Sequence, residues 1–144
     1  MSGASAIMNF TPSDVDPERN MSVQVNTEPH GSHPKEQKYN YNFGFRKIGD
    51  KLIETKENSY QWHMPHNVEL KLIFTAEPEH TLSHIDIKLD QTSTDHDAKI
   101  IGGGIGKNYI EVMVTARNTY WFKYEARAFQ RTSLLHVFLD KTGK

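Results

Sequence analysis

The sequence predicts an all-β protein, an antiparallel β-sandwich or barrel of about seven to eight short strands behind a flexible N-terminal tail. Apolar and polar residues alternate along most of the chain from Tyr39 onward, which is the period of a strand with one buried face. Turn-forming residues, such as those at 49–50 and 65–67, interrupt the alternation at short intervals. No clear helical spacing accompanies them, so we expect no mixed α/β fold.

The tail differs from the rest of the chain in composition. Residues 1–38 hold four of the six prolines and only one of the fifteen aromatic side chains, Phe10. A segment with so little apolar surface cannot offset the entropy lost on ordering. We therefore expect a flexible tail at 1–38, a β-sandwich domain at 39–130 and a C-terminal extension at 131–144.

Within the domain, the strongest strand signals are strictly alternating. In the segment 68–76, for example, Val68, Leu70, Leu72 and Phe74 lie on one face of an extended chain. The expected strands are 39–46, 52–56, 59–64, 68–76, 85–89, 110–116 and 120–126. The three residues 117–119 are short enough to form a hairpin between the last two. The segment 133–139 fits either a final strand or a short amphipathic helix.

Composition excludes several classes of protein. The 144 residues include 17 Lys and Arg against 18 Asp and Glu, for a formal net charge of −1. Such a balance does not provide the basic surface of a nucleic-acid backbone binder, so we expect no direct contact with DNA. The chain has no cysteine, which excludes disulfides and thiolate chemistry. It has no apolar run of about 18 residues, so we expect no membrane partner.

No motif indicates catalysis or a cofactor. The glycine-rich segment at 102–107 misses the phosphate-loop spacing and precedes a strand pattern rather than a helix. We interpret Gly103, Gly104 and Gly106 as a structural turn that needs positive φ, and Gly49 with Asp50 as another. The eight histidines do not have the spacing of metal ligands. We expect no enzyme activity, no cofactor and no metal.

Two kinds of surface site remain. Trp121, Lys123 and Arg127 alternate onto one strand face, with Phe129 at its end, and Trp and Arg are enriched where proteins contact one another. This is our candidate protein-contact face; the alternative is that Trp121 covers the edge of the core. Two Asn-x-Ser/Thr sequons make Asn9 and Asn20 candidate glycosylation sites.

Three segments in order carry a family resemblance. They are GFRKIGD at 44–50, IDIKLDQ at 85–91 and AKIIGGGIG at 98–106, the last followed by a strand. Together they resemble the insect multiprotein bridging factor 2 family over about residues 41–129. The chain departs from that family in the loop at 92–97, where TSTDHD replaces the usual glycines.

The resemblance implies a non-enzymatic protein-interaction domain. The family is named for a transcriptional coactivator that bridges two partners. One is a DNA-bound regulator, which is a nuclear receptor complex, and the other is the set of basal transcription factors. The implied location is the nucleus or cytoplasm, and the first ten residues do not have the pattern of a signal peptide. The alternative is a secreted gut, salivary or defence-response protein of the same family that binds a small apolar ligand. The two sequons favour this alternative.

Overall fold

The computed structural model of the chain describes residues 5–12 and 35–132. Within these ranges it has six strands and no helix. All neighbouring strands pair antiparallel in a single sheet with the order β1-β3-β6-β4-β2, and β5 pairs with β6. The predicted all-β antiparallel class is therefore confirmed. The strands are β1 (Ser5–Pro12), β2 (Gln37–Gly44), β3 (Lys51–Thr75), β4 (His80–Gln91), β5 (His96–Gly103) and β6 (Tyr109–Thr132).

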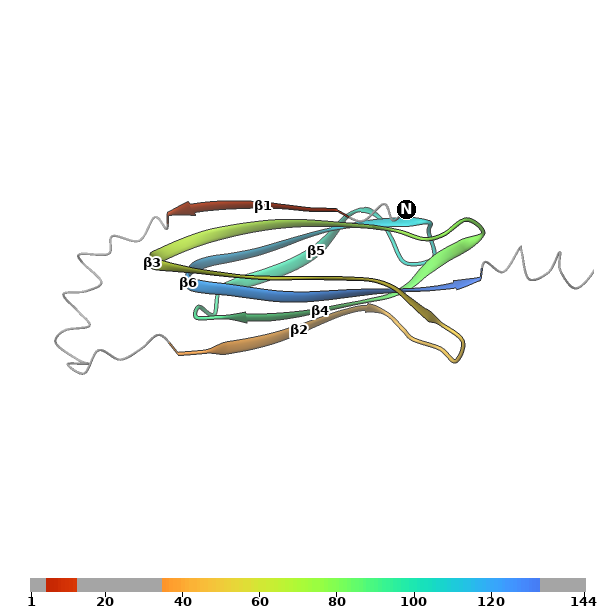
Figure 1. The fold of residues 1–144 in the computed structure, drawn as a ribbon, viewed down its shortest axis with the longest axis horizontal. Coiled ribbons are helices and arrows are strands. Elements are labelled where there is room, and N and C mark those ends of the chain that lie inside the picture. Colours follow the sequence, from red (N-terminus) through yellow and green to blue (C-terminus); the bar gives the residue numbers. More distant parts are fainter. Residues whose placement is uncertain (1–4, 13–34, 133–144) are drawn as a thin grey trace, which may run out of the picture.

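Two long strands fold back on themselves and give the sheet two layers (Figure 1). The first half of β3 pairs with the second half of β6, from Lys51 opposite Gln130 to Gln61 opposite Trp121. Beyond an irregular stretch, the second half of β3 pairs with the first half of β6. The upper layer of Figure 1 thus contains β1, the second half of β3, the first half of β6 and β5. The lower layer contains the first half of β3, the second half of β6, β4 and β2.

The prediction of a hairpin at 117–119 is wrong. The chain does reverse there, but the two halves of β6 lie in different layers and pair with β3 instead of with each other. Asn118 has a φ of 59° at the bend in β6. The matching bend in β3 contains Pro65. The hydrogen-bond ladder is interrupted there, so the missing backbone N–H of proline is not needed. Several segments predicted as separate strands are therefore halves of β3 and β6, which leaves six strands.

Part of the expected flexible tail is a strand. Ser5–Pro12 pairs with β3 along its whole length, with Phe10 opposite Val68. Met8 packs against the core, and the Phe10 ring lies 4.6 Å from that of Tyr60. Composition averaged over 38 residues hides these few alternating side chains. Residues 13–34 and 133–144, which include most of the predicted tail and the segment 133–139, lie outside the described ranges.

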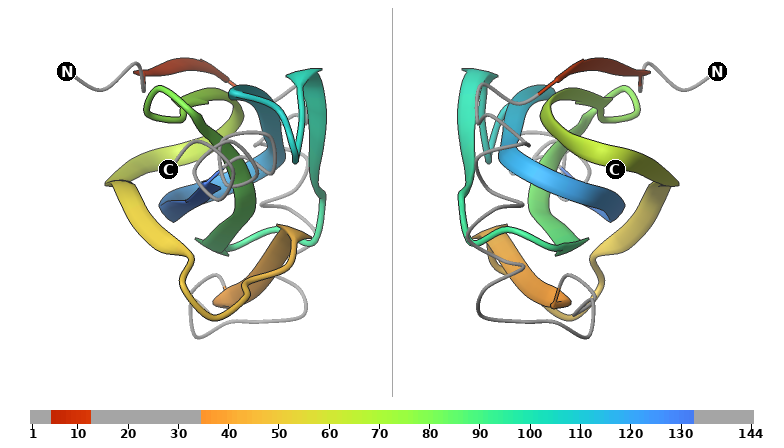
Figure 2. Two further views of the ribbon diagram at one scale, coloured as in Figure 1. Left: turned by 90° about the vertical axis from the view of Figure 1, so that its right-hand side faces the viewer. Right: turned by 90° about the vertical axis from the view of Figure 1, so that its left-hand side faces the viewer.

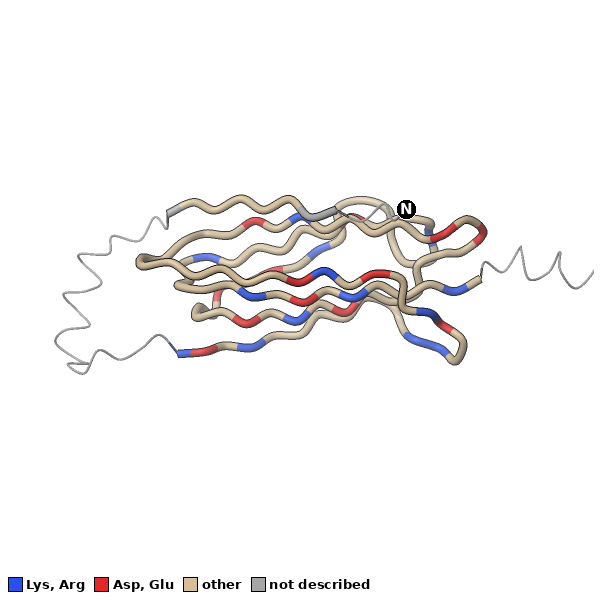
Figure 3. Tube along the Cα trace, in the orientation of Figure 1, with Lys and Arg blue, Asp and Glu red and all other residues tan. Residues whose placement is uncertain are grey.

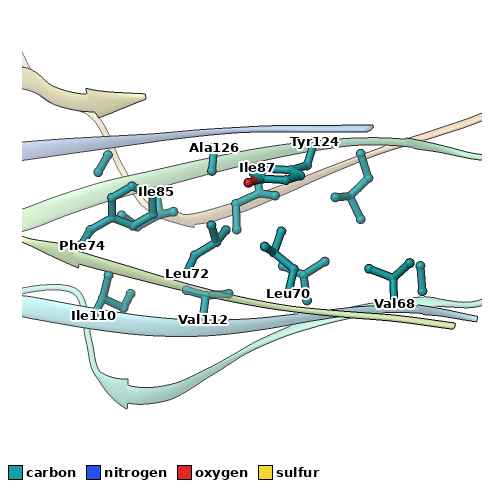
Figure 4. Close-up of a cluster of buried hydrophobic side chains, with 14 of the residues drawn as sticks. Val68, Leu70, Leu72, Phe74, Ile85, Ile87, Ile110, Val112, Tyr124 and Ala126 are labelled. Atoms are coloured by element: carbon teal, nitrogen blue, oxygen red, sulfur yellow. The ribbon is translucent and has the colours of Figure 1, made fainter. Parts of the chain in front are cut away.

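The core lies between the two layers and is filled by side chains (Figure 4). Leu70, Leu72 and Phe74 of β3 are fully buried, as are Ile85 and Ile87 of β4. The faces predicted from alternation in 68–76, 85–89 and 110–116 are confirmed as core faces. The buried side chains that form this cluster are Val68, Leu70, Leu72, Phe74, Ala76, Leu82, Ile85, Ile87, Leu89, Ile110, Val112, Val114, Ala116, Phe122, Tyr124, Ala126 and Ala128.

Aromatic side chains join the layers at the open edge between β2 and β5. Figure 2 shows the course of these two strands. The His96 ring of β5 stacks on the Tyr39 ring of β2 at 3.6 Å. The Tyr41 hydroxyl is hydrogen-bonded to His96 Nδ1. Burial raises the pKa of Tyr41, and the nearby charge of Asp97 adds to that shift. These contacts connect the two layers where no backbone ladder does.

Candidate functional site

The predicted contact residues lie in the second half of β6. Trp121, Lys123 and Arg127 share the outer face of the lower layer, because the alternating residues Phe122 and Tyr124 point into the core. Trp121 is half-buried and its Nε1 donates to Asp90 Oδ1 at 2.9 Å. Lys123 is exposed.

The other two predicted contact residues, Arg127 and Phe129, already make contacts within the chain. Arg127 donates to Asp86 Oδ2 at 2.6 Å, and this hydrogen bond raises the pKa of the guanidinium. Phe129 is only 3% exposed and does not extend the face. The Arg46 guanidinium lies 4.2 Å from the centre of its ring, and the His84 ring stacks on it at 5.5 Å. Alternation along β6 could not reveal that Arg46, 83 residues earlier, covers this position.

A groove of about 440 Å³ crosses the same outer face. In register, Lys38 of β2 lies opposite Asp90 of β4, which lies opposite Lys123 of β6. The next row places Lys88 opposite Glu125. Acidic and basic side chains thus alternate across three strands, as the colours of Figure 3 show on the lower strands. Trp121 joins this groove through its hydrogen bond to Asp90.

A second surface lies in the loop between β2 and β3. The chain enters it at Gly44, whose φ is 78° and where a Cβ would meet the Ser83 carbonyl at 2.2 Å. It then makes a tight turn in which Asp50 N donates to the Lys47 carbonyl at 3.0 Å, with Gly49 at a φ of 96°. Asp50 Oδ2 accepts a further hydrogen bond from Lys47 N at 2.8 Å. Gly49 and Asp50 therefore lie in a turn, as the sequence suggested.

Arg131 of β6 holds this loop. Its Nε donates to Asp50 Oδ1 at 2.9 Å and its Nη2 to Asp50 Oδ2 at 2.7 Å. The Nη2 also donates to the Phe45 carbonyl at 3.0 Å. The Asp50 side chain is 2% exposed, and the hydrogen bonds from Arg131 hold the pKa of this carboxyl far below its usual range. In contrast, the side chains of Phe45 and Ile48 are exposed to solvent.

A family model described as transcription activator MBF2 matches residues 43–129. The chain belongs to this family. No curated protein and no solved structure matches it. The matched range begins at the residue before Gly44, so it contains the whole β2–β3 loop, and it contains the β4 and β6 sides of the groove. Arg131 and Lys38 lie outside the matched range.

The glycine turn of this MBF2 family member joins β5 to β6. Gly103, Gly104 and Gly106 have φ values of 62°, 157° and 86°. A Cβ at Gly103 would lie 2.2 Å from the Tyr109 carbonyl, so the close approach of the two strands requires glycine. Gly106 N donates to the Leu82 carbonyl at 2.8 Å, which ties the turn to β4.

The sequons divide between described and undescribed residues. The Asn9 side chain is exposed on β1, where it borders a groove of about 420 Å³ with Asn67, Glu69 and Arg117. Asn20 lies outside the described ranges. In the part of this MBF2 family member that the structure describes, no group of three or more His, Asp or Glu side chains is placed to hold a metal ion. The same residues include no helix long and apolar enough to cross a membrane.

Arg131 and Arg46 were not among the site residues predicted from the sequence. Arg131 was placed in the C-terminal extension, whereas β6 continues to Thr132. Alternation stops at the adjacent apolar residues Ala128 and Phe129, so no local signal placed Arg131 in this strand. The arginine in the family segment 44–50 gave no hint that it covers Phe129, since that contact depends on the tertiary fold.

Proposed function

We propose that this chain is a non-catalytic transcription activator that acts through protein contacts alone. Its partners are a DNA-bound regulator, by resemblance a nuclear receptor complex, and basal transcription factors, which the chain bridges without touching DNA itself. It requires no cofactor and acts in the nucleus or cytoplasm. The family assignment supports the activator role.

The observation that carries the protein-contact part is the groove on the outer face of the lower layer. Lys38, Lys88 and Lys123 border it together with Asp90 and Glu125. Alternating charges of this kind select a partner with the complementary pattern and exclude others.

Trp121 supplies the apolar part of the same surface. Its indole N–H is already paired with Asp90, so contact with a partner leaves no buried donor unsatisfied. A half-buried tryptophan beside exposed lysines is a typical energetic centre of a protein interface.

Charge reversal tests this surface. The double variant Lys88→Glu/Lys123→Glu should reduce activation of a reporter gene by the full chain, tethered to a DNA-binding domain, by at least about tenfold. Capture of purified basal transcription factors should fall with it. The new glutamates face Asp90 and Glu125, so the melting temperature should fall as well, and circular dichroism at the assay temperature must show that the variant is folded. Lys99→Glu, an exposed lysine on β5, is the matched control. Equal activity of the double variant and the control would contradict the proposal.

A secreted defence-response role is the second candidate, and the exposed sequon at Asn9 favours it. Intact mass before and after glycosidase treatment, on protein from its natural tissue, separates the two. A glycan on Asn9 or Asn20 would require passage through the secretory pathway and would replace the activator proposal. An unmodified mass would favour the activator.

A further inference from the structure

The β2–β3 loop holds two large apolar side chains out in water. Phe45 is 79% exposed and Ile48 is 105% exposed, more than any other large hydrophobic side chain in the described ranges. They follow Gly44 on a loop at the end of the molecule, at the right in Figure 1. Neither belongs to the groove proposed above to contact protein partners. Both side chains stand on one short loop and are candidates for contact with a partner surface.

The loop is preorganised in this conformation. The buried carboxylate of Asp50 accepts hydrogen bonds from the Arg131 guanidinium and from Lys47 N. Arg131 also fixes the Phe45 carbonyl. Because the backbone is already held, a ligand of Phe45 and Ile48 does not need to order it, and this lowers the entropic cost of binding.

The charges around the apolar pair are mainly positive. Arg46 and Lys47 lie between Phe45 and Ile48 in the chain, and Lys51 follows the turn at the start of β3. The one acidic residue of the loop, Asp50, is neutralised by its ion pair with Arg131. The surface that meets this loop should therefore be both apolar and anionic.

We propose that the β2–β3 loop is a peripheral binding site for anionic phospholipid surfaces. Phe45 and Ile48 enter the headgroup region, while Lys47 and Lys51 remain at the level of the lipid phosphates and carboxylates. Lipids adapt to a convex loop, whereas a protein partner would need a matching pocket. This proposal departs from the expectation of no membrane partner, which rested only on the absence of an apolar run long enough to span a bilayer.

Acidic residues at the same end of the molecule oppose this binding and provide a test. Glu77 and Glu79 lie on the turn between β3 and β4, which is at the same end of the molecule as the β2–β3 loop in Figure 1. A hydrogen bond from Gln130, together with the charge of Lys51, lowers the pKa of Glu77, so this carboxylate stays charged near neutral pH. The molecule should therefore meet the surface tilted onto the β2–β3 loop, and removal of an acidic charge should strengthen binding.

The experiment is co-sedimentation of the full chain with vesicles of phosphatidylcholine, with and without about 30% phosphatidylserine. Binding should require phosphatidylserine and should weaken as salt is raised. Phe45→Ser/Ile48→Ser and, separately, Lys47→Glu should each weaken it at least about tenfold. Glu79→Gln should strengthen it. Ile7→Ser, which removes a 50% exposed apolar side chain from β1, is the matched control and should bind like the original chain.

Two results would overturn the proposal. The first is no binding to the phosphatidylserine vesicles at low salt. The second is that Lys47→Glu loses vesicle binding while Phe45→Ser/Ile48→Ser binds fully. This result would mean electrostatic adsorption without insertion of the apolar side chains. If the first result is found, photo-crosslinking from position 48 to a protein would make the loop a protein contact instead. Unchanged melting temperatures confirm that the variants are folded.

Discussion

The Arg131 guanidinium donates to both carboxylate oxygens of Asp50, a residue 81 positions earlier in the chain. This pair joins the end of β6 to the β2–β3 loop, and the Asp50 side chain is almost fully buried beneath it. Because the arginine also holds the Phe45 carbonyl, one side chain fixes both ends of the turn. The position of the loop therefore depends on a residue two places beyond the family match.

Arg131→Ala should destabilise the fold by about 2 kcal/mol, because it leaves the buried Asp50 carboxylate without its main partner. Asp50→Asn should cost less, since the half-exposed guanidinium of Arg131 then turns to water. Urea unfolding of the two variants measures the difference. Equal stability of Arg131→Ala and the original chain would show that the pair contributes nothing to the fold.

Asp50 also predicts how stability depends on pH. Its pKa in the folded chain lies below its unfolded value of about 3.9, so the unfolded state binds the proton more readily. The stabilisation is complete above that unfolded value and is lost as pH falls through it towards the folded pKa. Unfolding free energy should therefore fall more steeply between about pH 5 and pH 2 in the original chain than in Asp50→Asn. Parallel curves would contradict the assignment.

Phe129 and Trp121, grouped by the sequence on one face, should respond differently to truncation. Phe129 is buried beneath Arg46 and His84, so Phe129→Ala should cost about 3 kcal/mol. Trp121 is half-buried with one side-chain hydrogen bond, so Trp121→Ala should cost about 1 kcal/mol. Thermal and urea unfolding test this order, and the reverse order would make Trp121 the core residue. Only Trp121→Ala should also weaken partner capture.

Strand faces were predictable because burial repeats every second residue. Val68, Leu70 and Leu72 could be assigned to the core from alternation alone. The bends at Pro65 and Asn118 were read as chain breaks, because a local pattern cannot distinguish a hairpin from a strand that changes layer. The fixed geometry of the β2–β3 loop depends on Arg131, and no local signal connects residues so far apart. The glycine-aspartate turn and the arginine of this loop were recognised as part of a family segment. They did not indicate that the loop is an exposed apolar site.

β1 gives the last prediction, since it was expected to be part of a flexible tail. Phe10 contacts Tyr60 and Trp62, with ring centres at 4.6 and 5.1 Å, and is itself 37% exposed. Phe10→Ser should remove both contacts and cost about 1 kcal/mol. It should also shift the fluorescence emission of Trp62 to longer wavelength. The measurement uses a Trp121→Phe background, in which Trp62 is the remaining one of the two tryptophans. Ile7→Ser, on the outer face of the same strand, should leave Trp62 emission unchanged, because Ile7 lies opposite Lys71 and away from the aromatic rings. If Phe10→Ser leaves both stability and emission unchanged, β1 does not cover this edge of the sandwich in solution.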